Sequence, residues 1–370
     1  PADGPTSAGA AADAGSRPKV KKKRGFFRRH LALTSLAVIV VLVVGVAGGY
    51  VWWLNHQLSN ITRFDAHIKV APSKKNGDNN QPLNILLLGA DNGANGKSVT
   101  QDLKDGKWTP GLHRSDTIIL AHIPADRSSV QLVSIPRDSW VKVPGDPYAV
   151  HGHAKINAAF SWGGPTLAIR VVQDLTHVHI DHVAVIDWSG FKDLTTALGG
   201  IPVYIPHTFY DDSQKIWWRK GWQTLEGKPA LQYVRTRHGL AAGDLDRIKR
   251  QQNFMRAVMG KLLSSGTTRN PITLARVVGV ITQYLTVDKT WTNSEIRDLA
   301  LSMRNLSSAD VTFVTAPVAN PAGTSSDGQS IVILDRKKLR EMIHAVETDE
   351  LNKYIAANPG SKLPGNTHVR

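Results

Sequence analysis

The chain has 370 residues, of which 41% are hydrophobic, so it is long enough to bury a sizeable core in one or two domains. Its 45 basic and 30 acidic side chains give a net charge of +15. The absence of cysteine excludes thiol catalysis and a disulfide framework, and it is consistent with an exported domain.

The N-terminal tail, residues 1–30, is rich in Ala, Gly, Pro and Ser, and we expect it to be disordered. It carries eight basic and two acidic side chains, which is +6 of the total and leaves +9 for the rest of the chain. Residues 31–54 contain no charged side chain, and a helix of that length would reach roughly 36 Å, enough to span a bilayer. The basic cluster before this span predicts a cytoplasmic N-terminus.

A cleaved signal peptide is the alternative for this segment. Its apolar core would be shorter, and Trp52 and Trp53 stand where a small-residue cleavage site would follow. We therefore expect a retained single-pass transmembrane helix in the cell membrane, with everything after residue 54 outside the cytoplasm. Nucleic acid is then excluded as a partner, whereas the membrane surface and anionic cell-wall polymers remain.

The outer part alternates strands with helices. Residues 55–82 predict a polar linker, and residues 92–113 predict a polar, glycine-rich loop. Short apolar runs predict strands at Leu83–Gly89, Thr117–Ile123, Val130–Pro136, His182–Trp188, Val203–Ile205, 311–318 and 331–335. Helical patterns cover Ile156–Trp162, Thr166–Leu175 after Pro165, a segment capped by Ser189, a segment from Asp244, 271–285, 293–304 capped by Asn293, and Arg336 to about Val346.

This alternation predicts an α/β fold, a three-layer α-β-α sandwich with a central mixed sheet. We expect a main domain over residues 83–264 and further helices and strands over 265–350 that pack on the same domain. A loose tail is expected over residues 351–370.

One segment, Leu225–Gln252, concentrates arginines around a short loop that contains glycine. Asp244, Arg247 and Gln251 follow at spacings i, i+3 and i+7, so their side chains can converge on one side of a helix. Together with Arg235 and Arg237 they could form a phosphate or pyrophosphate cradle, because the arginine fork binds two oxygens at once. A solvated basic surface with exposed ion pairs is the alternative interpretation.

Polar residues also stand at the ends of three apolar runs. Asp91 follows the first run, Arg114 and Asp116 precede the second, and Arg137 and Asp138 follow the third. Such positions often line the ligand crevice of α/β folds. The oxygens of Asp91 and Asp116 suit Mg²⁺, which is often shared with phosphate. Local ion pairs and turn caps are the alternative for each motif taken alone.

The fourteen histidines show no metal-binding pattern, so surface and packing roles are favoured over metal ligation. Trp217, Trp218 and Trp222 lie in a basic segment, KIWWRKGW. They could touch the membrane surface, stack on a sugar ring or pack the loop.

Several of these motifs occur together in one known family. In chain order they are GAD, RSDTIIL, VSIPRDSWV, KINAAFSWGGPTLAI, GF..L..ALGGI.V and LEGKPALQYVRTRH…GDLDRIKRQQ. In this combination, residues 83–264 closely resemble the LytR-CpsA-Psr family of cell-wall glycopolymer ligases. The loop between Asp91 and Arg114 is longer than the family usually has.

The resemblance implies a Mg²⁺-dependent phosphotransferase that moves a glycopolymer from a polyprenyl-pyrophosphate carrier to a peptidoglycan acceptor. It implies that the carrier lipid occupies an apolar tunnel. Carried over by position, the pyrophosphate-binding residues are Arg114, Arg137, Arg235, Arg237, Arg247 and Gln251. Asp91 and Asp116 match the metal-associated carboxylates, and Asp244 falls on a polar position of the family's motif.

The implied chemistry is attack of a sugar hydroxyl on the phosphorus nearest the glycan, which expels polyprenyl phosphate. Arg137 and Mg²⁺ would neutralise the developing charge, and either Asp116 or Asp91 would position or deprotonate the hydroxyl. Two other functions stay open. One is a non-catalytic, membrane-anchored regulator of the envelope that binds anionic polymer or lipid. The other is a pyrophosphatase that hydrolyses the carrier.

Overall fold

The computed structural model describes residues 49, 52–53, 55–68, 81–91, 98–236, 244–365 and 367, without the side chains of 244–247 and 268. The chain divides into two compact units, Pro1–Trp53 and Leu54–Arg370. Every labelled helix and strand lies in the second unit. The expected tail and nearly all of the expected span, residues 31–54, lie outside the described residues. Among the residues that are described, none of the helices has the length and apolar character needed to cross a membrane.

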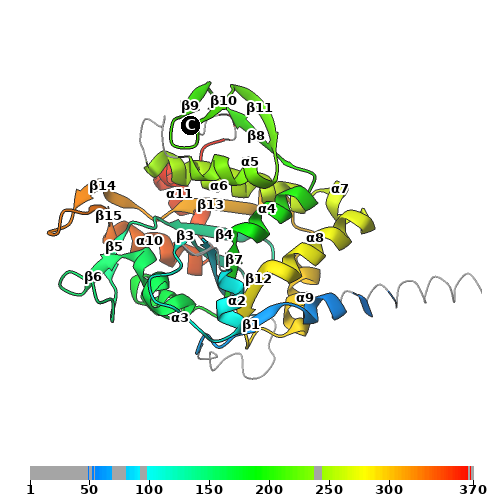
Figure 1. Cartoon of the computed structure of the whole chain (residues 1–370), viewed down its shortest axis with the longest axis horizontal. Coiled ribbons are helices and arrows are strands. Elements are labelled where there is room, and N and C mark those ends of the chain that lie inside the picture. The colour runs from blue at the N-terminus through cyan, green and yellow to red at the C-terminus, as the bar shows by residue number, and fades with distance from the viewer. Residues whose placement is uncertain are drawn as a thin grey trace, which may run out of the picture. The chain divides into compact units, whose positions relative to one another are not determined.

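A mixed sheet of seven strands forms the centre of the second unit (Figure 1). In spatial order its strands are β1 (Thr62–Phe64), β12 (Leu285–Asp288), β7 (His182–Asp187), β2 (Leu83–Ala90), β3 (Ser115–Ile123), β4 (Val130–Ile135) and β13 (Val311–Thr315). The strands β2, β3 and β4 form an antiparallel meander, while β7 runs parallel to β2 and β13 runs parallel to β4. The predicted α/β fold with a central mixed sheet is therefore confirmed.

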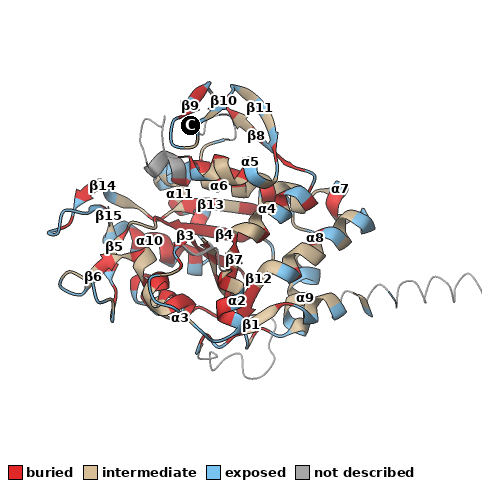
Figure 2. Ribbon diagram, viewed as in Figure 1, coloured by how far each residue is buried: buried red, intermediate tan, exposed pale blue. Residues whose placement is uncertain are grey.

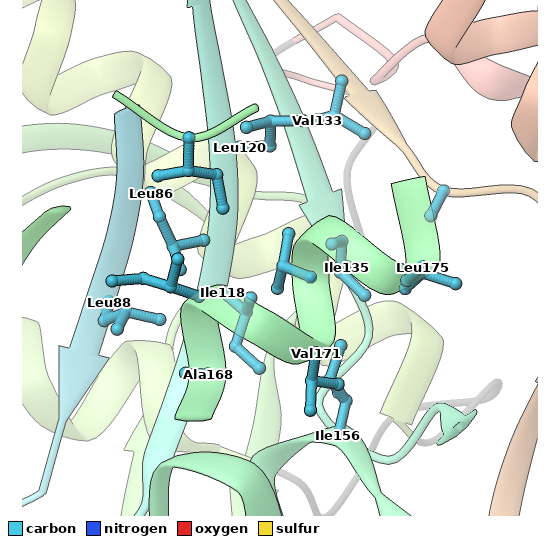
Figure 3. Packing of buried hydrophobic residues seen from close by; sticks show 14 of the residues in the cluster. Leu86, Leu88, Ile118, Leu120, Val133, Ile135, Ile156, Ala168, Val171 and Leu175 are labelled. Carbon is cyan, nitrogen blue, oxygen red and sulfur yellow. The ribbon is translucent and has the colours of Figure 1, made fainter. Parts of the chain in front are cut away.

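Helices cover both faces of this sheet, whose strands are largely buried (Figure 2) and carry apolar side chains on both sides. Leu86 and Leu88 point to the face covered by α3 (Ile156–Thr176) and α10 (Arg336–Glu347), where Figure 3 shows them with Ile118, Val171 and Leu175. Ile85 points to the other face, which α6 (Asp244–Leu262) and α9 (Asn293–Ser302) cover. The three layers are those expected from the sequence.

Two expected helices, on either side of Pro165, form one kinked helix. In α3 the backbone leaves helical geometry at Gly164 (φ 65°, ψ −163°), one residue before Pro165. This positive φ suits glycine, and a Cβ there would lie 3.2 Å from the indole of Trp108. Because proline lacks the N–H that a continuous helix needs, the second half of α3 starts at Pro165 as predicted.

Several expected boundaries were wrong. The expected linker, residues 55–82, contains β1, because Ile61 and Phe64 bury their side chains beside β12. The expected loop, residues 92–113, contains the helix α2 (Val99–Lys104). The expected loose tail contains α11 (Leu351–Ala357), which is held by buried Leu351.

The caps of two helices also differ from expectation, whereas the strands predicted at 311–318 and 331–335 are confirmed as β13 and β15 (Ser330–Leu334). The helix α4 (Trp188–Ala197) is capped by Asp187 and not by Ser189, and α9 is capped by Thr292 and not by Asn293. Of the late strands, β13 joins the central sheet, whereas β14 (Val318–Thr324) and β15 pair with each other. Further elements are the short strands β5 (Trp140–Lys142) and β6 (His153–Lys155), the short helix α7 (Ser265–Thr268) and the longer helix α8 (Pro271–Tyr284).

A long β-ribbon lies between α4 and α5 (Gly227–Arg235) in the sequence. It consists of β8 (Ile201–Ile205), β9 (Phe209–Asp211), β10 (Ile216–Trp218) and β11 (Gly221–Leu225). In it β8 pairs with β11 and β9 pairs with β10, so the chain turns at 212–215. Its inner face forms an apolar cluster with α4, α5, α6 and α8.

Candidate active site

The topology of the central sheet brings four strand ends to one edge. Ala90 at the end of β2 lies opposite both Ser115 at the start of β3 and Asp187 at the end of β7. Because β3 and β4 are antiparallel, the end of β4 at Ile135 also lies near the start of β3. The polar residues that follow or open these strands therefore gather at the same edge of the sheet.

Asp91 and Arg114 are joined by two hydrogen bonds at this edge. The Asp91 N–H donates to the Arg114 carbonyl (2.9 Å), and the Arg114 N–H donates to the Asp91 carboxylate (2.6 Å). Burial raises the pKa of Asp91 above its ordinary value, and the charge of Asp116 raises it further, although the Arg114 N–H opposes both. Asp91 and Asp116 are thus close enough for their charges to interact.

Arg137 lies between two carboxylates. Its guanidinium forms an ion pair with Asp116, and its Nε lies 3.5 Å from Asp138, which is also 3.8 Å from Lys155 Nζ. The side chains of Arg137 and Asp116 are 14% and 22% exposed, so the pair is largely shielded but reaches the surface. The Arg137 carbonyl accepts from Asn157 N in the first turn of α3 (3.1 Å), which fixes the backbone here.

The end of α5, here called the arginine arm because it carries Arg235, reaches the same edge of the sheet through Trp188. This tryptophan follows Asp187, and the guanidinium carbon of Arg235 lies 3.9 Å from the centre of its ring. Gln251 of α6 donates to the carbonyl of Val234 (3.2 Å), which joins α6 to the end of α5. The Gln251 side chain therefore lies next to the backbone that carries Arg235, and the convergence of their side chains on one ligand stays a prediction.

The remaining members of the predicted cradle are only partly placed. The helix α6 begins at Asp244, so the predicted spacing of Asp244, Arg247 and Gln251 along one helix is confirmed. The side chains of Asp244 and Arg247 are not described, and Arg237 lies outside the described residues. Arg250, the fourth arginine of the segment, is buried beneath the ribbon over the rings of Phe209 and Tyr233.

Two buried supports of the site were missed by the sequence analysis. His113 is fully buried, and its Nε2 lies 2.8 Å from a carboxylate oxygen of Asp102 in α2, while its Nδ1 faces the Asp91 carbonyl at 3.3 Å. Asp187 accepts from Ser98 Oγ (2.7 Å) and from Gly190 N (2.8 Å). The sequence offered one signal for Asp187, an acidic residue directly after the apolar run HVAVI. No local sequence pattern predicts that Asp102 contacts His113.

The donor set fits Mg²⁺ better than a histidine-bound metal. Among the residues described, no group of three or more histidines and carboxylates is placed to hold a metal ion by itself. Two carboxylates are enough for Mg²⁺, which keeps several waters and takes other oxygens from phosphate. Burial, and after it the charge of Asp116, raise the pKa of Asp91, and a bound divalent cation would offset both by supplying positive charge.

The described histidines include both buried and surface residues, and two of them illustrate local contacts. His182 stacks on Trp291 (ring centroids 4.6 Å apart) and lies 3.2 Å from buried Asp288. His153 faces the carbonyl of His151 at 3.2 Å. The expectation of packing roles therefore holds for these residues.

Sequence comparison identifies the family. The LytR_cpsA_psr family model matches residues 52–348, which is well over half of the chain. The chain belongs to this family. The match contains every strand of the central sheet and all of the site residues placed above.

Two relatives of this LytR_cpsA_psr protein are named for cell-wall biosynthesis and for teichoic acid transfer. The cell wall biosynthesis protein LcpA of Corynebacterium glutamicum is 34% identical over 283 residues, which cover 68% of this chain and 53% of LcpA. The polyisoprenyl-teichoic acid–peptidoglycan teichoic acid transferase TagV of Bacillus subtilis is 30% identical over 255 residues, covering 65% of this chain and 59% of TagV. The chain thus spans between half and two thirds of these relatives.

The fold is also found in solved structures. The LytR-Csp2A-Psr enzyme from Actinomyces oris superimposes with a TM-score of 0.58 at 20% identity, over 78% of this chain and 96% of that one. At this identity the likeness supports the shared fold alone.

Proposed function

We propose that the protein transfers a glycopolymer from a polyprenyl-pyrophosphate carrier to peptidoglycan in a Mg²⁺-assisted phosphotransfer. The observation that carries this proposal is the meeting of Asp91, Asp116 and Arg137 at one sheet edge, which Arg235 also reaches. Two arginines beside two carboxylates suit a pyrophosphate with its cation, and relatives named for cell-wall biosynthesis and teichoic acid transfer support the choice of substrate.

In the proposed reaction, a hydroxyl of peptidoglycan attacks the phosphorus nearest the glycan. A new phosphorus–oxygen bond forms, the bridging phosphorus–oxygen bond breaks, and polyprenyl phosphate leaves with the bonding electron pair. Arg137 and Arg235 would bind the phosphate oxygens and stabilise the charge that develops on the leaving phosphate. Arg114, Arg237, Arg247 and Gln251 are proposed as further pyrophosphate ligands on the strength of the family motif.

The proton of the attacking hydroxyl requires an acceptor at the same edge. Asp91 and Asp116 are the candidates, and the raised pKa of Asp91 favours Asp91 as the base. The same two carboxylates would hold Mg²⁺, which when bound supplies positive charge to the pyrophosphate. The ion pair with Arg137 would keep Asp116 directed at the reacting phosphate.

The test is a transfer assay with the full chain, a synthetic lipid-pyrophosphate glycan and purified peptidoglycan. We expect Mg²⁺-dependent release of lipid phosphate together with attachment of the glycan to insoluble wall. Release without attachment would favour a pyrophosphatase, and binding without release would favour a non-catalytic envelope regulator. Asp138→Asn is the matched control, because Asp138 contacts Arg137 and Lys155 but is not one of the proposed ligands of pyrophosphate or metal.

We also propose that the protein is a single-pass protein of the cell membrane, with its N-terminus in the cytoplasm and its catalytic unit outside. The uncharged run at 31–54 after a basic tail supports this placement. Protease added to intact protoplasts should remove the C-terminal unit and spare an N-terminal tag, and the opposite pattern would contradict the placement.

A further inference from the structure

The β-ribbon formed by β8–β11 has one apolar buried face and one aromatic exposed face. Ile201, Val203 and Ile205 of β8 bury their side chains against the helices, as do Phe209 and Trp218 further along. Because side chains alternate along a strand, the residues between them point away from the core. On that outer face, four aromatic side chains are gathered: Tyr204, Tyr210, Trp217 and Trp222.

These aromatics form two cross-strand pairs that remain in contact with water. Trp217 lies opposite Tyr210 and Trp222 lies opposite Tyr204, with ring centroids 5.1 Å and 5.6 Å apart. Trp217 and Trp222 are nevertheless 63% and 60% exposed, and Tyr210 is 39% exposed. Exposed aromatic side chains gathered on one face are typical of a binding surface. Trp218, the third tryptophan of the segment, packs in the core instead.

The charges around the aromatic pairs favour an anionic ligand. Lys215, Arg219 and Lys220 are exposed beside the two tryptophans. Every residue between Tyr210 and Trp222 is described, and Asp212 is the one exposed acid among them. Tryptophan and tyrosine can stack on the apolar faces of sugar rings, while the lysines and arginine can pair with carboxylates.

The ribbon is fastened to the arginine arm. Asp211 is fully buried and accepts from Ser213 N (3.0 Å) and from Gln214 Nε2 (2.7 Å). The same Gln214 amide also lies within hydrogen-bonding distance of the Gln232 carbonyl (2.9 Å) and of Thr236 Oγ1 (3.1 Å). Since Arg235 lies between Gln232 and Thr236 in sequence, the tip of the ribbon is fixed beside a residue of the candidate active site.

The position of the ribbon favours the cell wall over the membrane as its partner. The chain enters this unit at Asn55, whose side chain lies 3.5 Å from Arg297 of α9. In Figure 1, α9 and β1 lie at the bottom, whereas the ribbon lies at the top, above α5 and α6. Within this unit, the ribbon thus lies on the side opposite α9 and the entry of the chain.

We propose that the outer face of the β-ribbon is the docking surface for the acceptor, a peptidoglycan strand with its anionic peptide stems. The identity of this ligand rests on the proposed function. The tryptophans stack on sugar rings of the strand, and Lys215, Arg219 and Lys220 pair with the carboxylates of the stems. A peptidoglycan strand bound there presents its hydroxyls to the arginine arm, to which the tip of the ribbon is hydrogen-bonded through Gln214.

The test is co-sedimentation of the full chain with polymer-free peptidoglycan sacculi. The double variant Trp217→Ala with Trp222→Ala should bind about ten-fold or more weakly, because central aromatic anchors dominate such interfaces. The double Phe variant at the same positions should keep most of the binding. Tyr148→Ala is the matched control, since Tyr148 is 72% exposed and also contacts one other ring, that of Trp162.

Two results would overturn the proposal. One is undiminished sedimentation of the double Ala variant. The other is quenching of the fluorescence of Trp217 and Trp222 by brominated lipid, after the full chain is reconstituted in vesicles. The emission of these two residues is obtained by subtracting the signal of the double Phe variant from that of the wild type. Such quenching would place the ribbon in the bilayer. Arg137→Ala should sediment like the wild type, so a failure of the transfer reaction and a failure of the docking surface are distinguishable.

Discussion

Arg137→Ala tests the candidate active site most directly, because the structure predicts a large effect on turnover and a small one on stability. Arg137 and Asp116 are 14% and 22% exposed, so their ion pair lies between a surface pair and a buried one. Breaking a fully buried pair costs about 3–5 kcal/mol and a surface pair at most about 1, so we expect about 1–2 kcal/mol here. That loss lowers Tm by only a few degrees and leaves a domain of ordinary stability folded.

The expected loss of turnover is larger. A preorganised donor that meets the transition-state charge contributes on the order of 3 kcal/mol, so release of lipid phosphate should fall by about 100- to 1,000-fold. Arg137→Lys should fall between wild type and Arg137→Ala, because lysine keeps the charge but loses the two-pronged fork. Turnover is measured on the synthetic lipid-pyrophosphate glycan at saturating Mg²⁺, and Tm by circular dichroism on the same preparations.

The opposite pattern would refute this account of Arg137. A variant with near-wild-type turnover would show that Arg137 only caps the turn after β4. Asp138→Asn supplies the comparison, because this carboxylate shares the Arg137 contact and should affect stability more than turnover.

Three further predictions follow from the neighbouring residues. EDTA and Asp116→Asn should each abolish most turnover, and the two losses should not add when they are combined, because both remove the same metal site. An Asp116→Asn variant with full Mg²⁺ dependence would exclude Asp116 from that site. Burial and Asp116 raise the pKa of Asp91, so its ionised form destabilises the folded metal-free protein as pH rises through this titration. Asp91→Asn should therefore raise Tm at pH 7 without metal, and Mg²⁺ should stabilise the wild type alone; a lowered Tm would contradict this. His113→Ala should lower the free energy of unfolding in urea by about 2–4 kcal/mol, because it leaves a buried cavity and removes the 2.8 Å partner of Asp102. A loss below about 1 kcal/mol would show that the His113–Asp102 pair does not stabilise the fold.

The sequence determined those parts of the protein that depend on local pattern. The apolar period from Asp244 defined α6 and placed Gln251 on it, and the apolar runs identified β2, β3, β4 and β7 to within a few residues. Polar residues directly after or before those runs marked the site, since the end of a strand is where its side chains first reach solvent.

Tertiary structure alone decided what distant segments do to one another. The strand order β7–β2–β3–β4 brings Asp91 to Asp116, and the stacking of Arg235 on Trp188 brings the arginine arm to that edge, although no local pattern encodes either contact. In the same way, the three tryptophans of one short segment differ in exposure, because Trp218 faces the core whereas Trp217 and Trp222 lie on the outer face of the ribbon. Register and packing select which face of a strand meets the core, and they are set by the whole sheet rather than by the residue itself.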